Sequence, residues 1–133
     1  MKKKIFFFII FLISLRLLLP FLDLYPYKLC KNYLLIGKCC DNYMLKNGVF
    51  GKTLVNNMNR RAEWIINSDD IYGNKGNGHY FFINSVNDSV NDFSSLSDLN
   101  LFLNKRGLEN FDISKSENLT HLKYGLGRNR KYN

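Results

Sequence analysis

The sequence predicts an α+β fold in which a small antiparallel β-ribbon or three-stranded sheet is followed by a short C-terminal helix. Three observations predict this fold. Short apolar segments are bounded by Gly and Asn, a glycine-rich stretch precedes one of them, and leucines recur at helical spacing behind a pair of serines. With 133 residues, the chain holds one domain at most.

Three segments have the composition of strands. Residues 48–55 alternate apolar and polar, while 63–66 and 80–83 are short runs of aromatic and β-branched residues. A polar, basic turn separates the first two. Residues 73–78 are rich in Gly and Asn without the spacing of a phosphate-binding loop, so we expect a flexible hairpin tip there. Residues 85–92 read Ser-Val-Asn-Asp twice, which is typical of a low-complexity insertion.

One helix is expected after residue 93. Ser94 and Ser95 can cap its first turn, and Gly107 is expected to end it. We expect 108–113 to form another helical turn or two. The apolar stripe on the helix is most simply core, and it consists of Leu96, Leu99, Phe102 and Leu103.

We interpret the N-terminus as a leader helix that lies outside the folded domain and is either disordered or directed to a membrane. Three lysines at 2–4 precede an apolar run over 5–15, which favours an export signal over a permanent anchor in residues 1–24. Residues 25–47 hold four lysines against one acid, which is typical either of a second targeting segment or of an ordinary linker. A bipartite leader indicates a plastid of secondary endosymbiotic origin (apicoplast-like); a mitochondrion and the secretory pathway or membrane remain alternatives.

Composition and motifs argue against an enzyme. The net charge is +8. No nucleophile–base pair or plausible carboxylate pair is present, and Cys30, Cys39 and Cys40 fit no zinc spacing. We therefore expect no catalytic residue, no metal, no cofactor and no small-molecule substrate.

Two ordered segments carry a family resemblance. The first reads Asn-Gly-Val-Phe-Gly-Lys-Thr-Leu at 47–54, then Asn-Asn at 56–57 and Arg-Arg-Ala-Glu-Trp-Ile-Ile-Asn at 60–67. The second reads Ser-Asp-Leu-Asn-Leu-Phe-Leu-Asn-Lys-Arg-Gly-Leu-Glu-Asn-Phe at 97–111. Together they resemble the bacterial-type large-subunit ribosomal protein of the L-twenty-eight family, in its organellar form.

The sequence departs from the family pattern at several positions. Ile66 replaces a proline, Asn100 replaces an arginine, and Arg106 replaces one of two paired glycines. The resemblance covers roughly 47–113, so it implies a ribosomal-protein-like domain at 48–113 followed by a basic tail at 114–133.

The resemblance implies a structural constituent of an organellar large ribosomal subunit. Its partners would be ribosomal RNA and neighbouring large-subunit proteins, with membrane contact only through the leader. Cationic side chains would neutralise phosphates and amides would bond to the sugar-phosphate backbone. Trp64 could stack on a base, although a core position is the simpler interpretation. The candidate RNA-binding residues are Lys52, Asn57, Arg60, Arg61, Trp64, Asn67, Lys105, Arg106, Arg128, Arg130 and Lys131. The alternative is a small secreted or membrane-anchored protein without enzymatic function.

Overall fold

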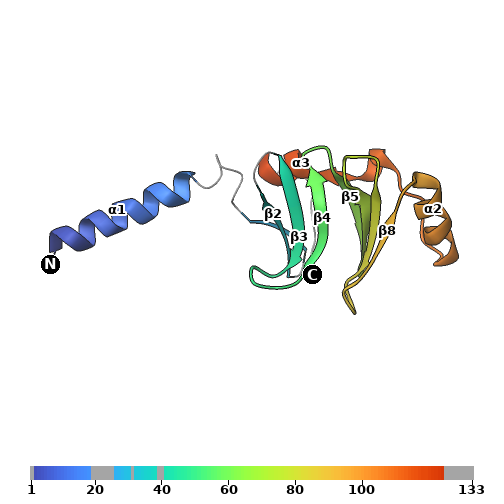
Figure 1. Ribbon diagram of the computed structural model, residues 1–133, viewed down its shortest axis with the longest axis horizontal. Helices are drawn as coiled ribbons and strands as arrows, with labels where there is room; N and C mark the ends of the chain where they lie inside the picture. Colours follow the sequence, from blue (N-terminus) through green and yellow to red (C-terminus); the bar gives the residue numbers. More distant parts are fainter. Residues whose placement is uncertain (1, 19–25, 31, 39–40, 125–133) are drawn as a thin grey trace.

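The computed structural model describes residues 2–18, 26–30, 32–38 and 41–124 (Figure 1). Its folded part contains two antiparallel sheets and short helices, so the α+β class is confirmed. The sheets have four and five strands, where the sequence predicted a ribbon or a three-stranded sheet. The larger β content has a specific origin in residues 27–47 and 89–93, described below.

The first sheet is a meander of four consecutive strands. They are β1 (Tyr27–Cys30), β2 (Tyr33–Gly37), β3 (Asn42–Asn47) and β4 (Thr53–Asn59), in that spatial order. The alternation of a half-buried sheet is clear in β2, where Tyr33 and Leu35 are buried while Leu34 and Ile36 remain partly exposed. One face of this sheet therefore supplies the core and the other faces outward.

The second sheet has the spatial order β8-β7-β6-β5-β9. Its strands are β5 (Glu63–Asn67), β6 (Asp70–Asn74), β7 (Tyr80–Asn84), β8 (Ser89–Phe93) and β9 (Glu117–Asn118). The expected strands at 63–66 and 80–83 are confirmed as β5 and β7. The glycine-rich stretch is the hairpin tip between β6 and β7, with Gly76 and Gly78 in the left-handed region at φ of 87° and 84°.

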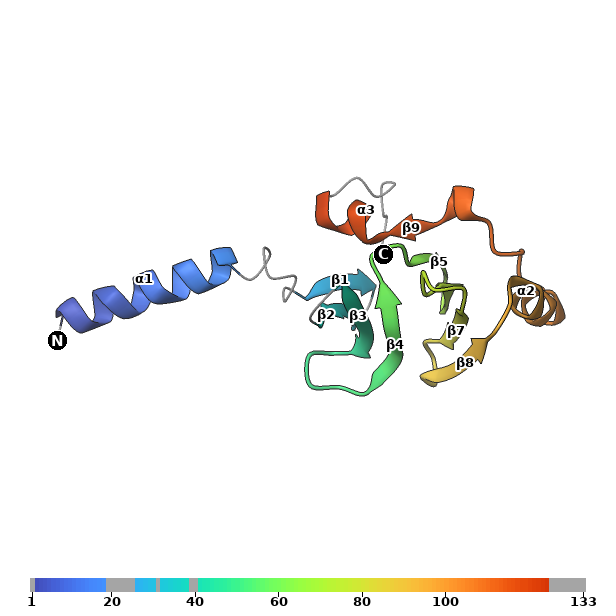
Figure 2. The same ribbon diagram turned by 45° about the horizontal axis from the view of Figure 1, so that its top comes forward.

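The principal core lies between the two sheets (Figure 2). Trp64 is fully buried at its centre, with Tyr43 and Leu45 from the first sheet and Phe81 and Ile83 from the second. Leu119, the first residue of α3 (Leu119–Tyr124), is also buried in this cluster. Large aromatic side chains in one shared cluster indicate that the sheets fold as a single unit.

A second core covers the opposite face of the five-stranded sheet. There α2 (Leu96–Lys105) lays Leu99 and Leu103 on Tyr72 and Phe82. The predicted core stripe is confirmed at these two leucines and at Phe102, which packs partly buried against them, whereas Leu96 is exposed. The second sheet is therefore buried on both faces, which explains the near-continuous apolar sequence of β7.

The ends of α2 follow from local chemistry. Ser95 is the N-cap, and its hydroxyl accepts a hydrogen bond from the Asp98 backbone N–H at 3.1 Å. Gly107, at φ of 73°, follows the last turn. Its N–H donates to the Asn104 carbonyl and that of Leu108 donates to the Leu103 carbonyl, which is the Schellman pattern. The predicted helix, with its stop at Gly107, is confirmed.

Several sequence-based boundaries were wrong. Residues 27–47 are not a linker outside the domain, because β1, β2 and β3 supply core side chains such as Leu29, Tyr33 and Leu45. The expected strand at 48–55 is instead a loop at 48–52 followed by β4, since Gly48 adopts a positive φ of 77°. The repeat at 85–92 forms the β7–β8 turn and most of β8. No helix covers 108–112; a single 3-10 turn, η1 (Ile113–Lys115), follows.

Helix α1 (Lys2–Leu18) stands apart from the sheets in both views (Figures 1 and 2). Its apolar side chains are exposed on all sides, with Phe7 at 69 % and Leu17 at 66 %. Among the described residues, no helix combines the length and apolarity needed to cross a bilayer. The predicted leader is thus helical over 2–18 and contributes nothing to either core.

Candidate nucleic-acid interface

A basic turn joins the two sheets. Residues 59–62 form a tight turn between β4 and β5, closed by the Ala62 N–H donating to the Asn59 carbonyl at 2.9 Å. The Asn59 side chain organises this turn. Its Oδ1 accepts from the Arg61 N–H at 2.8 Å, and its Nδ2 donates to the Gly76 carbonyl at 2.8 Å. Because Ala62 is buried, the two arginines between these anchors are held outward.

Gly76 makes the close contact between this turn and the β6–β7 tip possible. A Cβ added there would lie 1.9 Å from Asn59 Oδ1 and 2.9 Å from the Ala62 nitrogen, and its φ is +87°. The Asn59 N–H also donates to the Lys75 carbonyl at 2.9 Å. The turn and the tip therefore form one fixed support.

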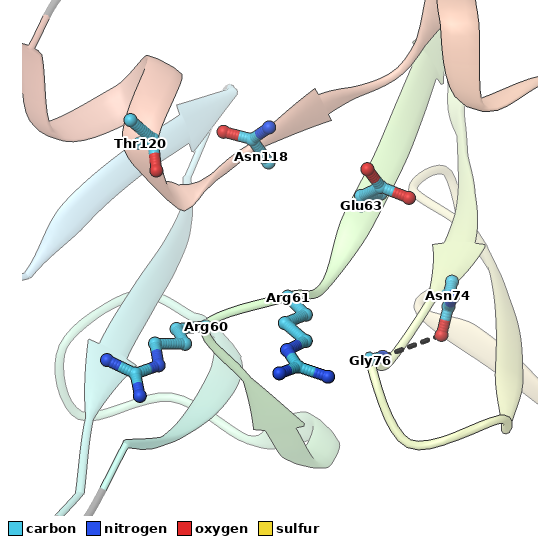
Figure 3. Close-up of a pocket in the computed structure, with 7 residues that line it drawn as sticks. All are labelled: Arg60, Arg61, Glu63, Asn74, Gly76, Asn118 and Thr120. Atoms are coloured by element: carbon cyan, nitrogen blue, oxygen red, sulfur yellow. Dashed lines mark hydrogen bonds between the residues drawn. The ribbon is translucent and has the colours of Figure 1, made fainter.

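A shallow polar hollow of about 380 Å³ opens beside this support (Figure 3). Its lining residues come from four places in the chain: the turn, β5, the β6–β7 hairpin and the β9–α3 junction. They are Arg60, Arg61, Glu63, Asn74, Gly76, Asn118 and Thr120. A second hollow of about 290 Å³ shares Glu63 and Asn118 with it and adds His121 and Ser116. The two hollows adjoin at Glu63 and Asn118, and together they form a groove whose lining side chains are mainly polar.

This groove carries both signs of charge: Glu63 lines both hollows and Glu117 the second, while Arg60 and Arg61 supply positive charge at the turn. Arg60 pairs with Asp41 at 3.4 Å, but the two side chains are 70 % and 49 % exposed, so water screens the pair and an anion can replace it at little cost. Arg61 is exposed and makes no ion pair within the described part of the chain. The guanidinium groups of these two neighbouring residues point in different directions (Figure 3), and each can bind phosphate oxygens beside the amide and hydroxyl side chains of the groove.

Only part of the predicted RNA-binding set gathers here. Arg60 and Arg61 line the hollow, and Asn57 is exposed nearby on β4, where its backbone carbonyl accepts a hydrogen bond from Asn77 of the β6–β7 tip. Lys52 comes just before β4, and Asn67 is the last residue of β5. Both are exposed at the strand ends that lie away from the turn. They therefore lie a full strand length from the arginines.

Trp64 has no exposed surface at all. Its ring is enclosed between the sheets, so a base cannot stack on it in this conformation. The core interpretation of Trp64 is correct and the stacking interpretation is wrong. The reason is the period of β5: Trp64 is buried between the partly exposed Glu63 and Ile65.

The second pair of cations lies elsewhere. Lys105 and Arg106 are at the end of α2, and the Arg106 guanidinium lies over the rings of Phe82 and Phe102, at 4.9 and 5.6 Å from their centroids. This is the face of the second sheet that points away from the first sheet. Arg60, Arg61, Lys105 and Arg106 therefore do not share one face. Arg128, Arg130 and Lys131 lie outside the described residues.

Other residues of the groove were not identified from the sequence. Asn74, Asn118 and Thr120 are distant in the chain from the arginines. Asparagine is so frequent in this sequence that no single one stands out. The pairing of β5 with β6 aligns Glu63 with Asn74, and the pairing of β5 with β9 aligns Glu63 with Asn118, so these residues meet only in the folded sheet.

No known protein-family model, curated protein sequence or solved structure matches this chain.

Proposed function

We propose that this protein is a non-catalytic RNA-binding protein that contacts the sugar-phosphate backbone through the groove at Arg60 and Arg61. The observation that carries the proposal is the fixed turn, which holds two exposed arginines beside a hollow lined with amides. Polar side chains of this kind position a nucleic-acid backbone and do not by themselves read its sequence.

The more specific form of the proposal is a structural component of an organellar large ribosomal subunit, with ribosomal RNA and neighbouring large-subunit proteins as partners. It is supported by the resemblance of residues 47–113 and by the absence of a plausible catalytic group in the sequence. The leader at 1–24 supports import into an organelle, with a plastid reached through the secretory pathway as the first choice and the mitochondrion as the second.

The groove can be tested by measuring RNA affinity as a function of salt concentration. Neutralising one phosphate contact on single-stranded RNA changes the slope of log K against log salt by about 0.7. We expect the double variant Arg60→Gln/Arg61→Gln to reduce the slope by about 1.4 and to weaken binding at low salt. The matched control Lys105→Gln/Arg106→Gln removes the same charge from the other side and should leave the slope nearly unchanged. Equal losses in both variants would refute the assignment to the groove.

The ribosomal form needs a separate test in cells. Tagged full-length protein should sediment with the organellar large subunit and leave it at high salt. If the protein stays in light fractions while the organellar ribosome is intact, the ribosomal proposal is wrong even if the groove binds RNA in vitro.

One observation favours a second candidate, a membrane-anchored or secreted protein without enzymatic function. Helix α1 exposes apolar side chains on every side. Such a helix is expected either to lie in an apolar environment or to be cleaved from the mature protein. Resistance of the full chain to carbonate extraction from membranes would support anchoring. A mature form that starts after residue 18 would support cleavage instead.

A further inference from the structure

The outer face of the four-stranded sheet has no partner in the described part of the chain. Helix α2 packs on the other sheet, and α3 contacts β1 and β9. The outer face is aliphatic at its centre, where Ile36 pairs directly with Met44 and Leu34 pairs with Lys46. The Thr53 hydroxyl lies 3.8 Å from the Met44 sulfur, so Thr53, the first residue of β4, lies on the same face.

Lysines surround this aliphatic centre. Lys28 is paired with Leu34, Lys46 lies one strand further, and Lys38 reaches across to the Asn56 side chain at 3.4 Å. None of the outward-facing residues that the structure describes on β1, β2 and β3 is acidic. Asp41 lies at the rim, where it pairs with Arg60. The face is therefore apolar in the middle and positive around it.

The β3–β4 loop adds an aromatic tip at one end of this face (Figure 2). Phe50 is 100 % exposed and Val49 is 52 % exposed. The loop is nevertheless held in place, because Asn47 N–H donates to the Lys52 carbonyl at 3.1 Å and Lys46 Nζ donates to the Val49 carbonyl at 3.1 Å. A loop tied down in this way presents Phe50 to solvent instead of folding it onto the protein.

We propose that this face, with its Val49–Phe50 tip, docks on the surface of an anionic lipid bilayer. The tip would enter the headgroup and acyl boundary, and Lys28, Lys38 and Lys46 would lie against negative headgroups. RNA fits this face less well, since Leu34, Ile36 and Met44 offer nothing to phosphates or base edges. The chain also arrives at this sheet from α1, whose apolar side chains are exposed all round. The docking surface is separate from the arginine groove and does not depend on it.

The test uses the full chain with Phe50→Trp and vesicles of phosphatidylcholine with or without phosphatidylserine, some carrying brominated acyl chains. Trp64 is enclosed in the core, so wild-type protein supplies the fluorescence baseline. We expect the emission of Trp at position 50 to shift to the blue and to be quenched by bromine on anionic vesicles. The matched control is Leu101→Trp, an exposed position on α2 at 58 %, which should stay unquenched.

These variants separate face docking from insertion of α1 alone. If α1 holds the chain on vesicles while position 50 stays unquenched, the proposal is wrong. Equal quenching at positions 50 and 101 would also overturn it, and so would a response of position 50 to single-stranded RNA but not to vesicles. Val49→Trp serves as a second reporter if Phe50→Trp does not retain the wild-type circular dichroism spectrum.

The lysine rim gives an independent measurement. Each lysine near an anionic surface contributes about fivefold to affinity, so Lys28→Gln/Lys38→Gln, which leaves the loop contact of Lys46 intact, should weaken docking on phosphatidylserine vesicles by about 25-fold. The control Lys105→Gln should leave it unchanged. Docking that is insensitive to both substitutions and to salt would overturn the role of the lysines.

Discussion

Tyr33→Phe tests the hydrogen bonds that tie the two sheets together away from the arginine turn. The Tyr33 hydroxyl, on β2, donates to Asp88 in the β7–β8 turn, and Asn47 Nδ2 donates to the other carboxylate oxygen at 2.7 Å. Asp88 has a positive φ of 54°, so the turn is shaped to present this carboxylate. The two hydrogen bonds are the polar link between β2, β3 and the β7–β8 turn.

The size of the effect follows from burial. The Tyr33 ring is only 3 % exposed, and Phe fills the same volume, so the substitution leaves no cavity. A hydrogen bond to a charged group contributes about 1.5–3 kcal/mol, and the lower figure applies because Asp88 is partly exposed and keeps Asn47 as a donor. We expect a loss of about 1.5 kcal/mol in the free energy of unfolding. For a domain of this size that lowers Tm by about 6–12 °C.

The assay is urea unfolding of wild type and variant between pH 3 and pH 8. The hydrogen bonds from Tyr33 and then Asn47 lower the pKa of Asp88 below its ordinary value. The ionised carboxylate therefore contributes its full stability above the unfolded pKa, and the contribution is lost as the pH falls toward the folded pKa. The difference between wild type and Tyr33→Phe should be constant from pH 5 to pH 8 and shrink below about pH 4. A loss that is absent, or unchanged at pH 3, would refute the reasoning. Tyr80→Phe is the control, because the Tyr80 hydroxyl makes no hydrogen bond within the described residues.

Three further predictions follow from the same contacts. Burial and then the hydrogen bond to Asp88 raise the pKa of Tyr33, so the phenol should stay protonated well above pH 10 in an ultraviolet titration, and folding stability should decline as the pH rises beyond 10. Gly76→Ala should lower the free energy of unfolding by about 1–3 kcal/mol in urea and weaken RNA binding, because its Cβ would displace the Asn59 side chain; unchanged stability would contradict the close contact. Leu103→Ala, at a position with no exposure, should cost about 2–5 kcal/mol, and a loss below 1 kcal/mol would show that α2 is dispensable for the fold.

The parts of the fold that the sequence predicted well have strong local signals. Strands β5 and β7 are short apolar runs, and α2 has a serine cap, a leucine stripe and a terminating glycine. In each case the local chemistry and the tertiary contacts agree, as expected for a minimally frustrated sequence.

The first three strands were missed because composition masked their pattern. The lysines at 28, 31, 38 and 46 suggested a targeting segment or a linker, but Lys28 and Lys46 lie on the outward side of strands whose inward side holds Leu29, Leu35 and Leu45. The period of two in β3, with Tyr43 and Leu45 buried, was the available signal. The groove could not be foreseen in full, because Asn74 and Asn118 converge on Glu63 only through the pairing of β5 with β6 and with β9.

From the sequence alone, Arg106 could either bind phosphate or cover the apolar core, and the structure separates these two roles. Its guanidinium lies over Phe82 and Phe102, so it covers the core beneath α2. We expect Arg106→Gln to lower the free energy of unfolding by about 0.5–1 kcal/mol through loss of the cation–π contacts and to leave RNA affinity unchanged. Lys105→Gln, at the neighbouring exposed position, should change neither quantity. Urea unfolding and RNA titration at one low salt concentration measure both. If Arg106→Gln keeps full stability and loses RNA affinity, then Arg106 binds phosphate, and the RNA must contact the α2 side of the molecule as well as the groove.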